Sequence, residues 1–136
     1  MSESSNEAVV RGVYQSFLDN DLQGVFDAMT EDVEWTWYGP TEIPLAGTWK
    51  GRDGAARWFD LLAETVEFGR FNPDEFEFVS QGDTVVVKGY EEGTIKPTGR
   101  TYEQQWVQFM TIRDGRITRF RHFPDTAAIA TAFAAD

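Results

Sequence analysis

The spacing of the apolar residues changes partway along this chain, and that change limits the folds it can adopt. Apolar residues recur at helical intervals over residues 9–18, 22–29 and 52–66. The β-branched and aromatic content of strands is found over residues 32–38, 67–81, 83–96, 101–113 and 116–124. Helices followed by a run of strands are typical of the α+β class. We predict one domain over residues 1–136, in which a curved antiparallel sheet wraps around the N-terminal helices as a cone.

Short local motifs predict where these elements begin, break and turn. Ser4 and Glu7 have capping-box spacing, and Asp53 is suited to cap the third helix. The Asn72-Pro73 pair leaves residues 67–81 as one long strand or as two. Asp114-Gly115 predicts a two-residue hairpin turn. The remaining segments are predicted to be a loop, 39–51, and a short C-terminal helix, 125–136.

Charge and cysteine content exclude several classes of function. The chain has 12 basic and 23 acidic residues, so it lacks the cationic surface that nucleic acid or an anionic membrane requires. With no cysteine and one histidine, it has no disulfide, no thiol nucleophile and no set of zinc ligands. The N-terminal stretch MSESSNEA has no signal-peptide pattern. We therefore expect a cytoplasmic protein without metal or cofactor.

Strand alternation from the Asp114-Gly115 turn predicts which residues share a face of the sheet. The turn pairs Ile112 with Ile117, and an unbroken ladder then places Phe109 opposite Phe120 and Val107 opposite His122. The concave face encloses a small-molecule pocket and is predicted to carry Gln105, Val107, Phe109, Thr118, Phe120 and His122. The convex face is predicted to carry Trp106, Gln108, Met110, Arg119 and Arg121.

The turn at Lys96–Arg100 decides which side of the preceding strand faces the pocket. A four-residue loop puts Tyr90 opposite Val107 and Lys88 opposite Phe109, so that Lys88, Tyr90 and Glu92 point into the pocket. A loop that differs by one residue would turn Val85, Val87 and Gly89 inward instead.

Three stretches give the chain a resemblance to a known family. They are FLDNDLQGVFDAMTEDVEW, GPTEIPLAGTWKGRDGAARWF and residues 83–129, which include DGRITRFRHFPD. The chain resembles the SnoaL-like branch of the nuclear transport factor 2-like superfamily, which has a cystatin-like fold and includes polyketide cyclases. The resemblance implies a cone-shaped pocket and a homodimer through the convex face. It leaves the activity open, because the same fold serves enzymes and binding proteins.

Known reactions of the family require residues that this chain lacks. Relatives similar to limonene epoxide hydrolase have a WRD stretch where this chain has Phe120-Arg121-His122. They have an Arg-x-Asp pair where it has Lys88-Gly89-Tyr90. The base of ketosteroid isomerase falls at Thr36 or Trp37. The resemblance therefore argues against epoxide hydrolysis and steroid isomerisation by those mechanisms.

Together these patterns predict a cofactor-independent isomerase, cyclase or dehydratase acting on a small, apolar, oxygen-bearing ligand. His122 would transfer a proton, and Tyr90, with Lys88 or Gln105, would stabilise an oxyanion. The ligand would contact Tyr14, Trp35, Trp37, Glu92, Gln105, Val107, Phe109 and Phe120. The alternatives are a binding protein without chemistry and a structural dimer module. If the register were reversed, Arg119 and Arg121 would bind an anion in the pocket instead of a second subunit.

Overall fold

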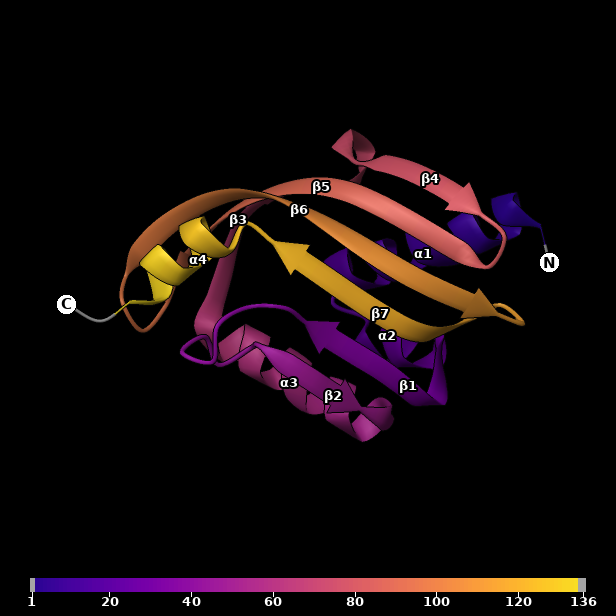
Figure 1. The fold of residues 1–136 in the computed structure, drawn as a ribbon, viewed down its shortest axis with the longest axis horizontal. Helices are drawn as coiled ribbons and strands as arrows, with labels where there is room; N and C mark the ends of the chain where they lie inside the picture. Colours follow the sequence, from indigo (N-terminus) through magenta and orange to yellow (C-terminus); the bar gives the residue numbers. More distant parts are fainter. Residues whose placement is uncertain (1, 135–136) are drawn as a thin grey trace.

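A computed structural model describes residues 2–134 and shows helices beneath one curved sheet (Figure 1). The helical elements are α1 (Glu3–Leu18), α2 (Leu22–Asp27), α3 (Gly51–Thr65), the short 3-10 helix η1 (Pro73–Glu75) and α4 (Thr126–Phe133). The strands are β1 (Met29–Trp37), β2 (Gly47–Lys50), β3 (Val66–Phe71), β4 (Glu77–Gln81), β5 (Thr84–Ile95), β6 (Arg100–Arg113) and β7 (Arg116–Pro124). The predicted single domain and C-terminal helix extend to residues 1, 135 and 136, which lie outside the described residues.

The seven strands form one sheet in the order β2-β1-β7-β6-β5-β3, and β4 pairs with the first half of β5. Neighbouring strands are antiparallel except β1 and β7, which run parallel. The fully antiparallel sheet predicted from the sequence was therefore wrong, and the sheet is mixed. The α+β class, the N-terminal helices and the curvature of the sheet are confirmed. The parallel pair joins strands far apart in sequence, where no short turn dictates direction.

Two predicted helix caps were wrong. The N-cap of α1 is Ser2, whose hydroxyl accepts a hydrogen bond from the Ser5 backbone N–H at 3.1 Å, so Ser4 and Glu7 lie inside the helix. Helix α3 begins at Gly51, two residues before Asp53, because Gly51 adopts a φ of 72° that turns the chain directly from β2 into the helix. None of the helices within residues 2–134 has the length and apolarity to cross a bilayer.

The predicted strands are present, but several of their boundaries differ from the prediction. Residues 67–81 form two strands separated by η1, so the second alternative is confirmed. The expected loop over 39–51 contains the short strand β2, which pairs with β1. Helix α2 ends at Asp27, so Met29 opens β1 and does not belong to the helix.

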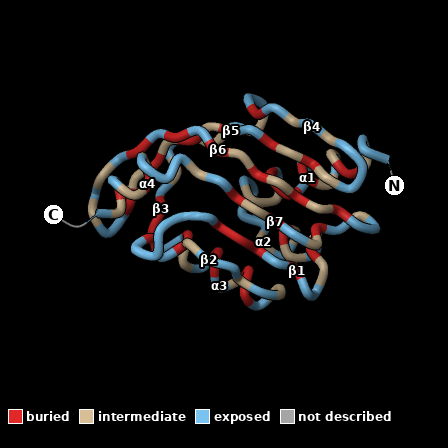
Figure 2. The backbone as a smooth tube through the Cα atoms, viewed as in Figure 1, coloured by how far each residue is buried: buried red, intermediate tan, exposed pale blue. Residues whose placement is uncertain are grey.

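A β-bulge in β7 determines which residues of β6 face inward. The Asp114-Gly115 turn is confirmed: both residues have positive φ, and Ile112 pairs with Ile117 as predicted. The next pair is Thr111 with Arg119, so Thr118 is an extra residue that has no opposite residue on β6. Beyond the bulge the ladder is shifted by one residue relative to the prediction. Figure 2 shows the resulting alternation of buried and less buried residues along β5 and β6.

Gly89 allows a large core ring to lie against β5. It pairs directly with Trp106 on β6, and a Cβ atom at this position would lie 2.2 Å from the Trp106 ring. Trp106 is 2% exposed, and the ring of Phe76 contacts it with centroids 4.9 Å apart. The inner face of β5 therefore tolerates no side chain at residue 89.

Gly89→Ala is expected to destabilise the protein by about 1–3 kcal/mol, because the buried Trp106 ring has no space into which to move. Urea unfolding at equilibrium measures this change. Gly12→Ala is the matched control, since an added Cβ there has no atom within 4 Å and Ala is preferred in a helix. Equal effects of the two substitutions would contradict the packing described for Gly89.

Candidate functional site

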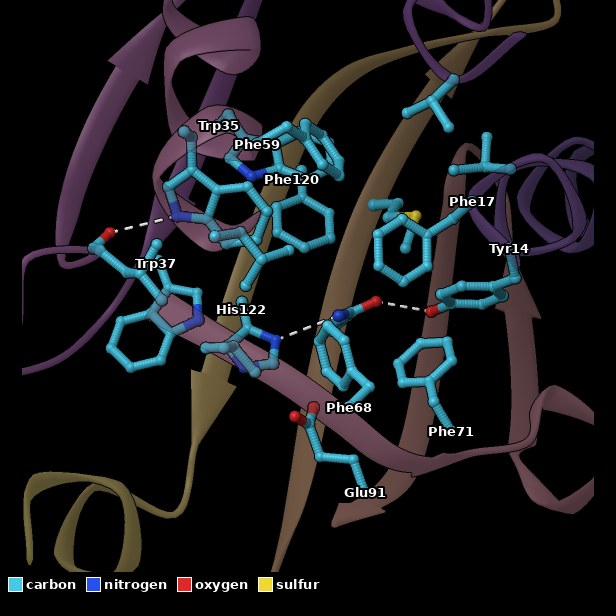
Figure 3. Close-up of a pocket in the computed structure, with 18 of the residues that line it drawn as sticks. Tyr14, Phe17, Trp35, Trp37, Phe59, Phe68, Phe71, Glu91, Phe120 and His122 are labelled. Atoms are coloured by element: carbon cyan, nitrogen blue, oxygen red, sulfur yellow. Dashed lines mark hydrogen bonds between the residues drawn. The ribbon is translucent and has the colours of Figure 1, made fainter. Parts of the chain in front are cut away.

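The concave face of the sheet and helices α1 and α3 enclose a cavity of about 80 Å³ (Figure 3). For comparison, an engineered apolar cavity of about 150 Å³ in T4 lysozyme holds one benzene. The interior of the present cavity therefore has room for a few heavy atoms. Most of its lining is apolar, and the polar lining residues are Tyr14, Glu91, Tyr102, Gln104, Gln108 and His122.

Aromatic rings form the wall around the last strand. Trp35 on β1 stacks on Phe120 of β7 with ring centroids 3.7 Å apart. Trp37 stacks on His122 at 5.5 Å, and Phe120 lies parallel to the same imidazole at 6.3 Å. The parallel pairing of β1 with β7 places Trp35 beside Phe120 and Trp37 beside His122. The imidazole therefore lies within a stack of flat rings.

A chain of hydrogen bonds crosses the cavity from α1 to β7. The Tyr14 hydroxyl donates to Oε1 of Gln108 at 2.5 Å, and Nε2 of Gln108 lies 3.0 Å from Nδ1 of His122. Figure 3 shows Tyr14 and His122 on opposite sides of the cavity, joined by the two dashed lines. All three side chains are buried. We call these three residues the Tyr14–Gln108–His122 relay.

Burial sets the charge state of the two ends of the relay. His122 is 4% exposed, and the cost of burying a charged imidazole lowers its pKa from 6.5 to about 3. Burial also raises the pKa of the Tyr14 hydroxyl well above its ordinary value. Both groups are therefore neutral at physiological pH, and the imidazole is a poor proton acceptor there.

Glu91 enters the same cavity from β5, and its carboxyl is held by a second polar cluster. Burial raises the pKa of Glu91 from 4.5 to about 7, an effect opposed by Tyr102, Gln104 and Trp106, which favour the charged form. The Tyr102 hydroxyl donates to Oε2 of Glu91 at 2.6 Å. Trp106 favours the charged form of Glu91 without a hydrogen bond of normal geometry, because its Nε1 has no such partner among the described residues. Near neutral pH the carboxyl therefore exists in both protonation states.

Glycines on both sides make room for the Glu91 cluster. The inner face of β5 carries Gly89, Glu91 and Gly93 in succession. A Cβ at Gly93 would lie 2.8 Å from the Tyr102 hydroxyl, just as one at Gly89 would meet the ring of Trp106. The missing side chains thus let both aromatic residues approach the strand on either side of the carboxyl.

Five residues predicted for the pocket line the cavity: Tyr14, Trp35, Trp37, Phe120 and His122. The other six predicted positions do not line it. The pocket placement was wrong for Lys88, Tyr90, Glu92, Gln105, Val107 and Phe109, which lie on the outer face of the sheet. The one-residue bulge at Thr118 exchanges the predicted inner and outer faces of β6. The predicted faces of β5 are exchanged as well, because Tyr90 pairs with Gln105 and the two side chains share the outer face.

The outer-face prediction failed for the same reason. Trp106, Gln108 and Met110 were expected on the convex face but are buried on the concave side. Arg119 and Arg121 lie on the outer face as predicted, because the bulge changes the faces of β6 and leaves the predicted alternation of β7 after Thr118 unchanged. Tyr90 is also outside, where its hydroxyl donates to Glu92 at 2.9 Å and to Glu103 at 3.1 Å.

Glu91 and Gln108 are site residues that the sequence analysis did not select. Glu91 belongs to the pair Glu91-Glu92, which is typical of a solvated strand end. A usable signal was nevertheless present: glycines two residues before and two residues after Glu91 leave space on its own face of the strand. Gln108 was assigned to the outer face by the uninterrupted ladder, and its type alone gave no reason to question that.

Comparison with known proteins agrees with this architecture. The SnoaL-like domain family matches residues 10–120. An NTF2-like protein from Burkholderia xenovorans is 35% identical, with a TM-score of 0.89 over 98% of this chain and 99% of its own. One from Burkholderia pseudomallei is 31% identical, with a TM-score of 0.84 over 99% and 100% of the two chains.

A third similar structure was solved in the presence of a ligand. TerC, co-crystallised with polyporic acid, is 28% identical, with a TM-score of 0.77 over 96% of this chain and 99% of its own. No protein of curated function matches the chain significantly. The family match covers most of the chain and agrees with the fold, so the chain belongs to the SnoaL-like domain family of NTF2-like proteins.

Proposed function

We propose that this protein is a cofactor-independent enzyme of the isomerase or cyclase type, and that Glu91 is its proton-transferring group. The observation that carries the proposal is a buried carboxyl with a pKa of about 7 that lines a cavity walled by aromatic rings. General acid–base catalysis is most effective when the pKa of the group is close to the working pH. TerC, co-crystallised with polyporic acid, supports an organic ligand for this cavity.

The proposed step is a proton transfer at carbon. The Glu91 carboxylate removes a proton from a carbon next to a carbonyl, and the electron pair of the broken C–H bond moves toward the carbonyl oxygen. The protonated carboxyl then returns the proton at the same or another carbon, which restores the carboxylate. His122 was our sequence-based candidate for this role. Its pKa of about 3 and the hydrogen bond at its Nδ1 favour Glu91 instead.

Solvent exchange tests this proposal without knowledge of the natural substrate. Simple ketones such as cyclopentanone are incubated with the protein in D₂O, and deuterium incorporation beside the carbonyl is followed by NMR. The wild-type protein is expected to exceed the buffer rate, and Glu91→Gln to lose about 10²–10⁴-fold of that excess. Glu92→Gln, the outward-facing neighbour, is the matched control. Ketone binding without exchange would instead indicate the non-catalytic binding protein.

We also propose that the outer face of the sheet pairs two copies of this chain. Phe109 and Phe123 contact each other there at 5.8 Å, and Phe123, 39% exposed, also stacks on Tyr38. The same face carries cations at Arg119 and Arg121 and carboxylates at Glu92 and Glu103. A twofold-related copy can place the charges of opposite sign against each other around the aromatic patch.

A further inference from the structure

We infer that Tyr14 and Gln108 are positioning residues that hold the His122 imidazole as a fixed hydrogen-bond donor, and that the ligand presents an uncharged acceptor oxygen to it. The ligand class rests on the proposed function, because it identifies where the carbonyl of the substrate lies. The positioning role rests on the geometry of the relay alone.

The relay has a direction, which Tyr14 sets. A neutral tyrosine hydroxyl donates to Oε1 of Gln108 at 2.5 Å, so the amide group must turn its NH₂ toward His122. Nε2 of Gln108 therefore donates to Nδ1 of His122 across 3.0 Å. A neutral imidazole with an accepting Nδ1 carries its proton on Nε2. The tyrosine on α1 thus determines which nitrogen of a histidine on β7 is protonated.

Packing holds both ends of the relay in place. The Tyr14 ring makes edge contacts with three phenylalanine rings, Phe71, Phe76 and Phe78, at centroid distances of 5.5 to 6.1 Å. The imidazole lies nearly parallel to Trp37 and Phe120. Rotation of either ring would lose these contacts together with a buried hydrogen bond. The donor direction of Nε2–H is therefore fixed before a ligand arrives.

The polar groups of the cavity wall select an acceptor. No described residue accepts a hydrogen bond from Nε2 of His122, and Nε1 of Trp35 is buried without a partner among residues 2–134. Oε1 of Gln108 and Oε1 of Gln104 are already engaged, the latter by the Asp125 backbone N–H. Nε1–H of Trp35 is thus a buried unpaired donor, which is costly unless a ligand satisfies it, and Nε2–H of His122 is a second donor without a hydrogen bond to another described residue.

The charges that line the cavity restrict the class of ligand further. None of the residues that line the cavity is a lysine or an arginine, so an anion would have no counter-charge there. An ammonium group has donors only: it could pair with the Glu91 carboxylate, but it would leave the N–H groups of His122 and Trp35 without an acceptor. An uncharged carbonyl oxygen satisfies these donors and leaves the neighbouring carbon for Glu91.

The tautomer of the single histidine tests the positioning role directly. Two-bond ¹H–¹⁵N correlation spectra of the labelled protein are expected to show protonated Nε2 and unprotonated Nδ1 from about pH 5 to pH 8. Tyr14→Phe frees the Gln108 amide to turn, so a mixture of tautomers is expected. Tyr102→Phe removes the other cavity hydroxyl, which bonds Glu91 and not Gln108, and is expected to leave the spectrum unchanged. A protonated Nδ1 in the wild-type protein overturns the proposal even if no variant folds.

Ligand titrations in the same experiment test the ligand class. Cyclopentanone is expected to shift the Nε2–H resonances of the wild-type protein, with about fivefold weaker binding to Tyr14→Phe. Cyclopentanecarboxylate and cyclopentylamine, an anion and a cation of similar ring size, are expected not to shift them at neutral pH. A shift caused only by a charged probe, or none up to the solubility limit of the ketone, overturns the ligand assignment. Failure of deuterium exchange alone would refute Glu91 catalysis and leave the tautomer result standing.

Discussion

Met110→Asp is expected to abolish cooperative folding. Met110 is 1% exposed on the inner face of β6, and no lysine or arginine lines the cavity beside it. An unpaired buried carboxylate costs several kcal/mol, a large share of the roughly 5–15 kcal/mol by which domains are stable. Circular dichroism and urea unfolding would show the loss of the native transition.

Phe109→Asp is the matched control, one residue away on the opposite face. Phe109 is half-buried beside Arg121, whose guanidinium carbon lies 5.3 Å from its ring centroid, so a carboxylate there has water and a cation nearby. This variant is expected to fold. It also tests the proposed pairing of two copies, since a charge in the aromatic patch should yield a monomer in light scattering. If Met110→Asp folded and Phe109→Asp did not, the result would contradict the bulge and support the register predicted from the sequence.

Glu91→Gln is expected to change how stability depends on pH. The folded-state pKa of Glu91 is raised from 4.5 to about 7, so the folded protein binds the proton more tightly than the unfolded chain. The associated stability is present below about pH 4.5 and is lost as the pH rises to about 7, a change of about 3 kcal/mol. The stability of Glu91→Gln relative to wild type should therefore increase by about 3 kcal/mol between about pH 4 and pH 8.

His122 acts in the opposite sense, which is why the difference between variant and wild type has to be measured. Its pKa is lowered from 6.5 to about 3, so its contribution to stability is gained as the pH rises through that interval. The two effects offset each other between about pH 4.5 and pH 6.5 in the wild-type protein. Urea unfolding gives the free energy of unfolding of each protein at each pH. Subtracting the wild-type profile from that of Glu91→Gln removes the contribution of His122, which both proteins share. Glu77→Gln, an exposed carboxyl on β4, is the control, and a pH-independent difference for Glu91→Gln would contradict the raised pKa.

The elements of this fold could be predicted from the sequence because their signals are local. Helical spacing, the Asn72-Pro73 break and the Asp114-Gly115 turn each act within a few residues, and each is present in the structure. The parallel neighbour of β1 could not be predicted this way. It depends on packing between residues that are far apart in sequence, such as Trp35 and Phe120.

The strand faces were not predictable because β6 is apolar on both sides. Trp106 and Met110 alternate with Val107 and Phe109, so a shift of one residue exchanges one apolar set for another. The period-two pattern that usually fixes a register is therefore absent where the bulge occurs. On β7 the inner residues Phe120 and His122 were placed correctly, because both follow the bulge at Thr118 and only the pairing residues on β6 are shifted.

The relay connects residues at the beginning and the end of the chain. Tyr14 and Gln108 are 94 positions apart in sequence, and His122 lies on the last strand. Such distant contacts form late, because their loop-closure entropy is compensated only when the intervening structure is in place. On the ribosome, α1 emerges long before β7 is synthesised. A nascent chain therefore has no complete binding cavity, and its ligand cannot assist folding until synthesis of the sheet is finished.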